Sequence, residues 1–184
     1  MHSGKPSILF VCVHNAGKSQ MAAALMRAKA GDAIAVFSGG THPGEELNGP
    51  ARQAIEEIGA SMAGEHPKTI SDEVFMNVDR IIILGNEAKL EARENMKGQI
   101  ETWLTPEPGP EAGDKLAQTR IVRDDIVRRI DELFAELTRS KDVRQKSHGP
   151  FRMRAQRWTL PDGSRVSSGS GGRPSSGPFS RNRT

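Results

Sequence analysis

Residues 8–30 constrain this chain most, because a short apolar run, a small polar loop and the start of a helix follow one another there. The strand-forming run begins at Ile8 and ends at Cys12, the only cysteine of the sequence, and helix-forming Ala, Met and Leu dominate from Gln20 onward. Backbone N–H groups at a helix start have no intrahelical acceptor and lie at the positive end of the helix dipole, so a loop at this place can hold an oxyanion. Lys18 adds a positive charge to the same loop. We therefore expect a strand, an anion-binding loop and a helix.

The position of Cys12 at the entrance of this loop predicts a reactive thiol. Loop N–H groups, the Lys18 ammonium and the Ser19 hydroxyl all favour the thiolate over the thiol. A lone cysteine after an apolar run is ordinarily a small buried hydrophobe, and a lone lysine at a helix start is ordinarily solvated. The neighbouring Asn15 and Gly17 favour the reactive interpretation, with Cys12, Lys18 and Ser19 as candidate catalytic residues. The expected oxyanion-binding residues are Val13, His14, Asn15, Ala16, Gly17, Lys18 and Ser19.

The loop fits two known patterns, each with one departure. As a nucleotide-binding loop, G-x-x-x-x-G-K-[ST], it matches at Gly17, Lys18 and Ser19 but has Cys12 in place of the first glycine. It also resembles the loop of the low molecular weight protein tyrosine phosphatases and related arsenate reductases, with Lys18 in place of their arginine. The flanking sequence favours this family, and within it the mycothiol-dependent arsenate reductases. The flanking matches are the strand 8–12 near the N-terminus, the helix opening Ser19-Gln20-Met21-Ala22, and Ser38-Gly39-Gly40-Thr41 after the next strand.

Strands and helices alternate along residues 1–138, which predicts an open α/β sandwich. Right-handed crossovers place helices on both faces of a four-stranded parallel sheet, and they place Cys12 among the loops at the carboxyl ends of the strands. The resemblance implies the same fold, the three-layer sandwich of the low molecular weight phosphatases. The expected strands are 8–12, 33–38, 78–84 and 100–104; the expected helices are 20–30, 50–58 with Asn48 as N-cap, a short helix capped by Ser71 or Asp72 and ending at Asn77, 87–96 and 120–137.

Charge divides the chain into two parts. Residues 1–138 carry 15 Lys and Arg against 21 Asp and Glu, a net charge of −6, whereas residues 139–184 carry 11 Lys and Arg against 2 Asp, a net charge of +9. The basic part is rich in Ser, Gly, Pro and Arg and has too little apolar surface to offset the entropy of ordering. We expect a catalytic domain over 1–138 and a disordered tail over 139–184. Such a tail permits weak contact with nucleic acid or acidic lipid, but we favour a solubilising extension or an artefact of gene-end assignment. We expect no membrane partner, and no nucleic-acid partner beyond such weak contacts.

The composition also bounds the compartment and the cofactors. No apolar run approaches the roughly 20 residues of a membrane helix, and no signal-peptide pattern is present, so we expect a soluble cytoplasmic protein. A single cysteine leaves no internal disulfide and no multi-cysteine metal site. We expect no bound cofactor and no metal.

Glu107 is the candidate proton donor. A leaving oxygen needs an acid that faces the nucleophile, and the resembled family supplies it from an Asp-Pro pair after a similar strand. Here Glu107-Pro108 resembles that pair with one extra methylene, and Pro106 restricts the backbone on the other side. A solvated glutamate in a proline-rich turn is the alternative. Glu111 and Asp114 lie in the same loop and compete for the role.

The resemblance implies a function in which arsenate is joined to a small thiol. Gly17 stands where thioredoxin-linked reductases often have a second loop cysteine, so an outside thiol must supply the electrons. The expected partners are arsenate or a phosphate-like oxyanion, mycothiol or another small thiol as co-substrate, and a glutaredoxin-like mycoredoxin that releases arsenite. Three alternatives stay open. They are a phosphatase for phosphotyrosine or other phosphomonoesters, a non-catalytic oxyanion-binding module, and, last, a nucleotide-hydrolysing enzyme, which lacks an acid where Gly85 and Asn86 follow the third strand.

Overall fold

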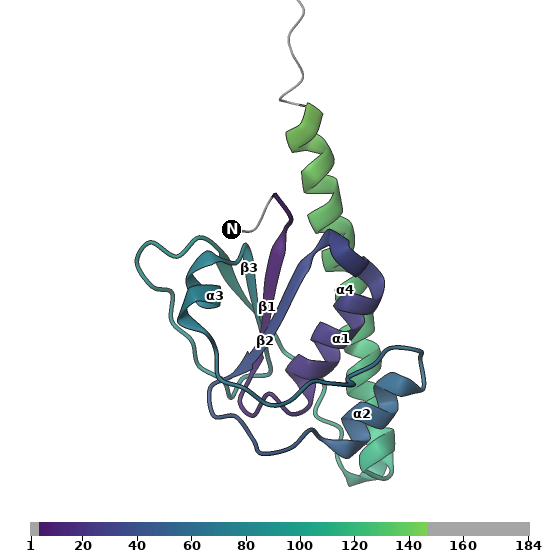
Figure 1. Cartoon of the computed structure of the whole chain (residues 1–184). Helices are drawn as coiled ribbons and strands as arrows, with labels where there is room; N and C mark the ends of the chain where they lie inside the picture. The colour runs from purple at the N-terminus through teal and green to yellow at the C-terminus, as the bar shows by residue number, and fades with distance from the viewer. Residues whose placement is uncertain (1–3, 147–184) are drawn as a thin grey trace, which may run out of the picture. The chain divides into compact units, whose positions relative to one another are not determined.

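The structure is a computed structural model that describes residues 4–146 (Figure 1). Four parallel strands form one sheet in the order β2-β1-β3-β4. Their register places Cys12 beside Gly40 and Leu84 beside Trp103, so the strands end at a common edge. The chain leaves β1 first toward β2 and then crosses to β3 on the other side, and ligands of open α/β sheets bind at such a switch point. The bounds are β1 Ser7–Cys12, β2 Ala35–Gly40, β3 Arg80–Leu84 and β4 Gln99–Trp103.

Helices cover both faces of the sheet, which makes three layers (Figure 1). Helices α1, α2 and α4 pack on one face and the short α3 packs on the other. This arrangement confirms the predicted three-layer α/β fold with a four-stranded parallel sheet. The bounds are α1 Lys18–Ala30, α2 Gly49–Glu56, α3 Asp72–Asn77 and α4 Lys115–Lys146, with 3-10 turns at Gly31–Ala33 and Pro110–Ala112.

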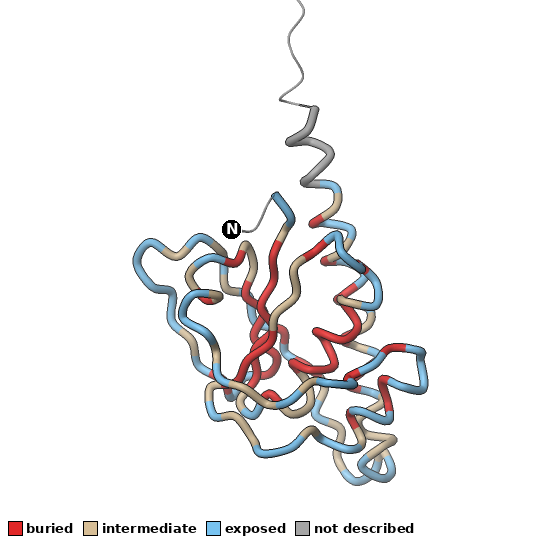
Figure 2. Tube along the Cα trace, viewed as in Figure 1, coloured by how far each residue is buried: buried red, intermediate tan, exposed pale blue. Residues whose placement is uncertain are grey.

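Strand β1 is the centre of the core, and all six of its residues are buried (Figure 2). Successive side chains of a strand point to opposite faces. Ile8 and Phe10 therefore pack against α1, α2 and α4, whereas Leu9 and Val11 pack against Phe75 of α3. Burial on both sides explains the continuous apolar run of the sequence, and it holds the end of β1 in a fixed place.

The predicted helix starts of α2 and α3 are confirmed by their caps. The Asn48 side chain accepts a hydrogen bond from the Ala51 N–H at 2.9 Å. Of the two candidate caps for α3, the structure selects Ser71, whose hydroxyl accepts from the Val74 N–H at 3.4 Å. Each cap satisfies a backbone donor that the helix leaves without a partner.

The predicted helix over 87–96 is wrong, since these residues form an irregular segment between β3 and β4. Their Ala, Glu, Lys and Leu content favours a helix, but such propensity is a weak preference that tertiary contacts override. Asn95 has a φ of 64°, which a helix does not allow. The Arg93 guanidinium lies 4.7 Å from the Phe75 ring centroid and bonds to Asp72 at 2.7 Å, which ties the segment to α3.

Helix α4 is longer at both ends than the predicted helix 120–137. It begins at Lys115, behind an Asp114 carboxylate that accepts from the Ala117 N–H at 2.8 Å, and it continues to Lys146. The predicted boundary of a disordered tail at residue 139 is therefore wrong for 139–146, where helix-forming Lys, Arg and Gln follow on from the packed part of α4. The rest of the predicted tail, 147–184, lies outside the described residues.

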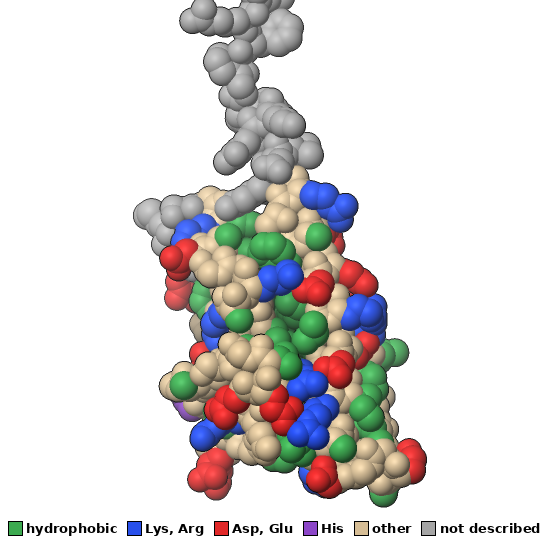
Figure 3. Space-filling model, turned by 90° about the vertical axis from the view of Figure 1, so that its right-hand side faces the viewer, with side chains coloured by type: hydrophobic (Ala, Val, Ile, Leu, Met, Phe, Trp, Pro, Cys, Tyr) green, Lys and Arg blue, Asp and Glu red, His purple; other side chains and the backbone are tan. Residues whose placement is uncertain are grey.

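The outer face of the helical layer carries charges of both signs (Figure 3). Lys29 pairs with Asp131 at 2.7 Å, and Arg129 pairs with Asp125 at 2.8 Å. Exposed or half-buried surface pairs of this kind contribute little to stability, and their mixed signs leave no strongly charged face there. Within residues 4–146, every helix is too short or too polar to cross a lipid bilayer.

Candidate active site

The sulfur of Cys12 lies at the carboxyl end of β1 and receives two polar contacts. The Asn15 N–H donates to Sγ at 3.2 Å, and the Ser19 Oγ lies 3.0 Å from Sγ. The residue is 8% exposed, so little water competes for the sulfur. Hydrogen-bond donors at these distances stabilise a thiolate more than a thiol. The thiolate is the form of cysteine that acts as a nucleophile.

Asn15 holds the loop in the shape that places these donors. Its φ of 50° lies in the left-handed region, which asparagine tolerates better than most residues. Its side chain is fully buried; Nδ2 donates to the Ser19 Oγ at 2.8 Å, while Oδ1 accepts from the Gln20 Nε2 at 3.1 Å and from the Lys68 N–H at 3.0 Å. Because Ser19 already accepts from Asn15, its own hydroxyl proton is free to point at Cys12.

The loop carbonyls bond to the segment that follows β2, so their hydrogen-bonding capacity is used within the protein. Within residues 4–146, the N–H groups of His14, Ala16 and Gly17 donate to no protein acceptor, which leaves them available for an oxyanion. The carbonyl contacts are Cys12 to the Thr41 N–H, Val13 to His42, His14 to Gly44 and Ala16 to Asn48, at 2.8–3.2 Å.

Gly40 permits this close packing of loop and segment. A Cβ at this position would lie 2.6 Å from the Val13 carbonyl oxygen and 3.0 Å from the Asn15 backbone nitrogen. Any side chain would therefore push the loop away from β2.

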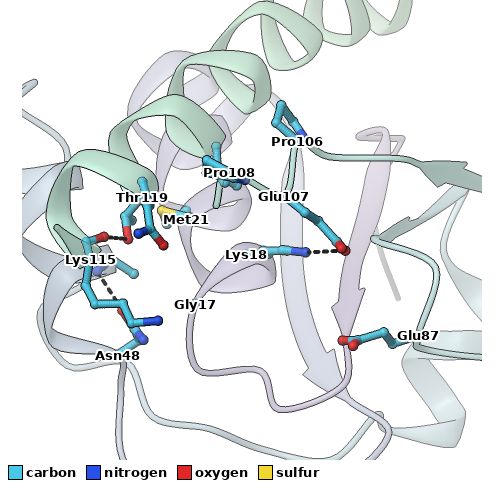
Figure 4. A pocket seen from close by; sticks show the side chains of 13 residues that line it. Gly17, Lys18, Met21, Asn48, Glu87, Pro106, Glu107, Pro108, Lys115 and Thr119 are labelled. Carbon is cyan, nitrogen blue, oxygen red and sulfur yellow. Dashed lines mark hydrogen bonds and ion pairs between the residues drawn. The ribbon is translucent and has the colours of Figure 1, made fainter. Parts of the chain in front are cut away.

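Lys18 crosses from the start of α1 to the ends of β3 and β4. Its Nζ lies 3.9 Å from the Glu107 Oε1 (Figure 4), and a Cβ at Gly85 would lie only 3.3 Å from Nζ. Both side chains line one cavity together with Glu87. The structure thus brings the predicted acid, Glu107, to the predicted cation, although the Glu107 side chain is 64% exposed.

The sequence of the domain that holds this site matches a known protein family. Residues 7–143 match the family described as low molecular weight phosphotyrosine protein phosphatase. The chain belongs to this family.

Members similar to the chain include several arsenate reductases. The arsenate reductase of Halalkalibacterium halodurans is 32% identical over 137 residues, which cover 72% of this chain and 96% of that protein. The arsenate reductase of Bacillus subtilis is 30% identical over 133 residues, with 70% and 94% covered.

Solved structures of the family show the same fold. A thioredoxin-dependent arsenate reductase of Corynebacterium glutamicum is 28% identical with a TM-score of 0.65, over 76% of this chain and 65% of that one, slightly under two thirds of its length. An arsenate reductase in a phosphate-binding state is 27% identical with a TM-score of 0.60, over 72% of this chain and 98% of that one. An arginine phosphatase from Geobacillus stearothermophilus shares the fold at 22% identity and a TM-score of 0.59.

The other predicted candidates of this phosphatase-like site have different surroundings. The His14 Nδ1–H donates to the His42 carbonyl oxygen at 3.1 Å, which directs the imidazole toward the segment after β2. Asp114 caps α4, and the Glu111 carboxylate folds back toward Gly109. Neither of these acids lines the cavity that Lys18 and Glu107 share, so Glu107 is the one of the three that faces the loop.

The residues that brace the loop from behind were missed at the sequence level. Gln20 is fully buried and donates through Nε2 to the His66 carbonyl oxygen at 3.0 Å as well as to Asn15. Glu65 binds Arg27 at 2.7 Å and Lys68 at 2.9 Å. The only sequence signal was the polar Gln20 directly after the loop. The contacts themselves join parts of the chain that are far apart in sequence.

Glu65 holds this brace through its charge. Burial by itself raises the pKa of the Glu65 carboxyl, but the hydrogen bond from Lys68 and the charges of Arg27 and Lys68 outweigh it. Its pKa therefore lies below the ordinary value for glutamate. The carboxylate is ionised at neutral pH and keeps Lys68, whose N–H reaches Asn15, against the loop.

Proposed function

We propose that this protein reduces arsenate with an external small thiol as co-substrate. The observation that carries the proposal is the contact set of Cys12, whose sulfur accepts from the Asn15 N–H and lies 3.0 Å from the Ser19 hydroxyl, inside a loop with free N–H groups. An oxyanion on those N–H groups lies against a nucleophile. The similarity to arsenate reductases of Halalkalibacterium halodurans and Bacillus subtilis supports arsenate as that oxyanion.

In the first step the Cys12 thiolate attacks arsenic. A bond between Sγ and arsenic forms, and one As–O bond breaks. Glu107 donates the proton with which this oxygen leaves as water. The loop N–H groups and Lys18 stabilise the negative oxygens that remain, and arsenic stays in the pentavalent state.

In the second step an external thiolate replaces Cys12 on arsenic. Cys12 is the only cysteine of these 184 residues, and Gly17 occupies the loop position where a second cysteine could form a disulfide. The incoming sulfur forms a bond to arsenic while the bond from Sγ to arsenic breaks, and Cys12 returns as a thiolate. The product is an arsenate–thiol adduct, and no electron has yet moved.

Reduction takes place when a redoxin thiolate attacks the sulfur of this adduct. A disulfide forms between the redoxin and the small thiol, and the electron pair of the broken S–As bond stays on arsenic, which leaves as arsenite. We assign the roles of small thiol and redoxin to mycothiol and a glutaredoxin-like mycoredoxin, on the resemblance of the loop sequence. The reducing cytosol, where a lone thiol stays reduced, suits this chemistry.

Lys18 favours this function over phosphomonoester hydrolysis. The planar guanidinium of arginine binds two oxygens at once, whereas an ammonium is a single point charge. Phosphoryl transfer spreads charge over three equatorial oxygens, so it depends more on such a bidentate grip. In addition, the Glu107 carboxylate lies 3.9 Å from the Lys18 ammonium and competes with an oxyanion for its positive charge.

The test is arsenite production from arsenate, mycothiol and mycoredoxin, compared with the Cys12→Ser variant. We expect arsenite above that control, and none when mycothiol is left out. Replacing mycothiol by glutathione with glutaredoxin, or by thioredoxin alone, identifies the reductant. Aryl phosphate turnover without any thiol would instead indicate a phosphatase, and oxyanion binding with neither turnover would indicate a binding module.

A further inference from the structure

Strand β4 is an open edge of the sheet. Among the described strands it pairs with β3 alone. The other edge strand, β2, is partly covered, because the Val36 carbonyl oxygen accepts from Arg27 at 3.3 Å and the Gly40 N–H donates to the Lys68 carbonyl oxygen at 2.8 Å. Lysine and proline often block the exposed strand edges of proteins, and the sequence of β4, Gln-Ile-Glu-Thr-Trp, contains neither. The edge is therefore available to another strand.

The hydrogen bonds of β4 show which of its backbone groups point outward. The Gln99 N–H donates to the Asp79 carbonyl oxygen at 3.4 Å, and the Trp103 carbonyl oxygen accepts from the Gly85 N–H at 2.9 Å. Residues 99, 101 and 103 therefore bond to β3, and the intervening residues direct their N–H and C=O groups to the open side. These outward groups belong to Ile100, Thr102 and Leu104.

The side chains of these outward residues lie on one face of the sheet. Ile100 packs with the cluster on the α3 side, and because side chains alternate along a strand, Thr102 and Leu104 face the same side. Leu104 is 65% exposed, more than any other large hydrophobic residue in the described part of the chain. An antiparallel second copy centred on Thr102 would place its Ile100 opposite Leu104, and the pair would remove this apolar side chain from water.

The register centred on Thr102 also avoids a repulsion between like charges. A two-fold axis at Glu101 would place two carboxylates directly opposite each other. With the axis at Thr102, Glu101 instead lies opposite Trp103 of the second copy. Within each chain the Trp103 indole already donates to the Glu101 carboxylate at 2.8 Å. The outward groups of Thr102 meet those of the other Thr102 in this register, as a hydrogen-bonded pair requires, so β4 is complementary to itself.

A groove of about 290 Å³ between β4 and α4 carries opposite charges at its two ends. Arg129 donates to the Leu104 carbonyl oxygen at 3.0 Å, at the end of β4. Glu136 pairs with Arg80, which lies beside Gln99 at the start of β4. An antiparallel second copy reverses these ends, so each Arg129 lies where the other copy has Glu136. This complementary arrangement favours antiparallel over parallel addition of the second strand.

We propose that the free edge of β4 is an interface between two copies of this chain. The two β4 strands pair antiparallel about Thr102, which joins the two four-stranded sheets into one and leaves α4 of both copies on the same face. Because β4 has only five residues, we expect a weak dimer, with a dissociation constant of roughly 10–100 μM.

Sedimentation velocity of the full chain between roughly 1 and 500 μM tests this interface. We expect the parent to shift from monomer to dimer over this range. Thr102→Pro removes an outward N–H and keeps the bonds to β3, so proline is tolerated there but pairing with the second copy is lost. Leu104→Lys places a charge where two apolar side chains meet. Both variants should raise the dissociation constant at least tenfold, whereas Ile58→Lys, at another exposed apolar residue, should leave it unchanged.

Amide hydrogen exchange measured by NMR on the parent needs no substitution, so it decides the matter even if Thr102→Pro does not fold. The N–H groups of Ile100, Thr102 and Leu104 should exchange more slowly as the protein concentration rises. A monomer at every concentration, or exchange at these three amides that does not depend on concentration, would overturn the proposal. Self-association that Thr102→Pro and Leu104→Lys leave unchanged would also overturn it, since the contact would then lie elsewhere, for example in the basic residues 139–184.

Discussion

The side-chain amide of Asn15 donates to the hydroxyl oxygen of Ser19 at 2.8 Å, and this contact leaves the Ser19 proton available for another acceptor. With one lone pair of Oγ occupied, the hydroxyl can donate to the Cys12 Sγ, 3.0 Å away. Ser19 thus connects Asn15, the residue with the left-handed backbone, to the Cys12 sulfur through two consecutive hydrogen bonds. Loop shape and thiol reactivity are coupled through these two side chains.

Ser19→Ala is expected to slow alkylation of Cys12 by iodoacetamide at neutral pH by about tenfold, because a hydrogen bond to a charged group contributes roughly 1.5–3 kcal/mol. The rate reports the thiolate, since the thiol does not react. The matched control is Ser61→Ala, at an exposed position outside the loop. An unchanged rate in Ser19→Ala would show that the hydroxyl does not stabilise the thiolate.

Two substitutions at Asn15 separate its backbone from its side chain. Asn15→Ala loses three side-chain hydrogen bonds and forces alanine to a φ of 50°, so we expect a loss of about 3 kcal/mol in the free energy of unfolding. Asn15→Gly loses the same bonds without the backbone strain and should lose about 1 kcal/mol less. Urea unfolding measures both. Equal losses would show that the backbone conformation is not strained.

Glu107→Gln is expected to lower the kcat of arsenite production about 100-fold, the usual contribution of a general acid. The KM for arsenate should stay equal or fall, because Lys18 loses a competing carboxylate at 3.9 Å. Glu111→Gln is the matched control, since Glu111 does not line the cavity. If kcat falls equally in Glu107→Gln and Glu111→Gln, Glu107 is not the proton donor.

The loop and the sheet were predictable from the sequence because their signals are local. The apolar run 8–12, its cysteine and the polar residues up to Ser19 stand in consecutive positions, and burial on both faces of a parallel strand leaves a clear pattern. Glu107 was also placed at the correct edge, because prolines and the end of a strand mark its turn. The segment 87–96 failed for the opposite reason, since its composition favours a helix while contacts to α3 decide its shape.

The brace behind the loop was not predictable by such signals. Gln20 contacts residue 66, and Asn15 contacts residue 68, across a stretch that contains β2 and α2. The approach of Lys18 to Gly85 likewise joins the start of α1 to the end of β3. A single sequence carries no record of such pairs, and only the folded chain shows them.

The brace predicts a dependence of stability on pH. The pKa of Glu65 is lower in the folded protein than its ordinary value near 4.5, so the unfolded chain takes up the proton first. The stabilisation is fully present at neutral pH and is lost as the pH falls below about 4.5 through the folded pKa. Glu65→Gln should therefore be less stable than the parent by about 1 kcal/mol or less at pH 7, with the difference closing in acid. Urea unfolding at pH 7 and pH 3.5 measures it, and a gap that does not change with pH would contradict the assignment.

Lys18→Arg tests why this loop carries a lysine. An arginine could grip two oxygens of a tetrahedral oxyanion at once, so aryl phosphate hydrolysis should rise, by about tenfold if one further charge-assisted hydrogen bond of roughly 1.5 kcal/mol forms in the transition state. Gly85 leaves room beside the longer head, because a Cβ there would be only 3.3 Å from the present Nζ. Arsenite production should change less, since its later steps depend on the incoming thiol rather than on the grip. Lys29→Arg, which pairs with Asp131 on the outer face, is the control. If phosphate turnover stays at the parent level while arsenite production falls, the lysine serves the thiol step and not the oxyanion.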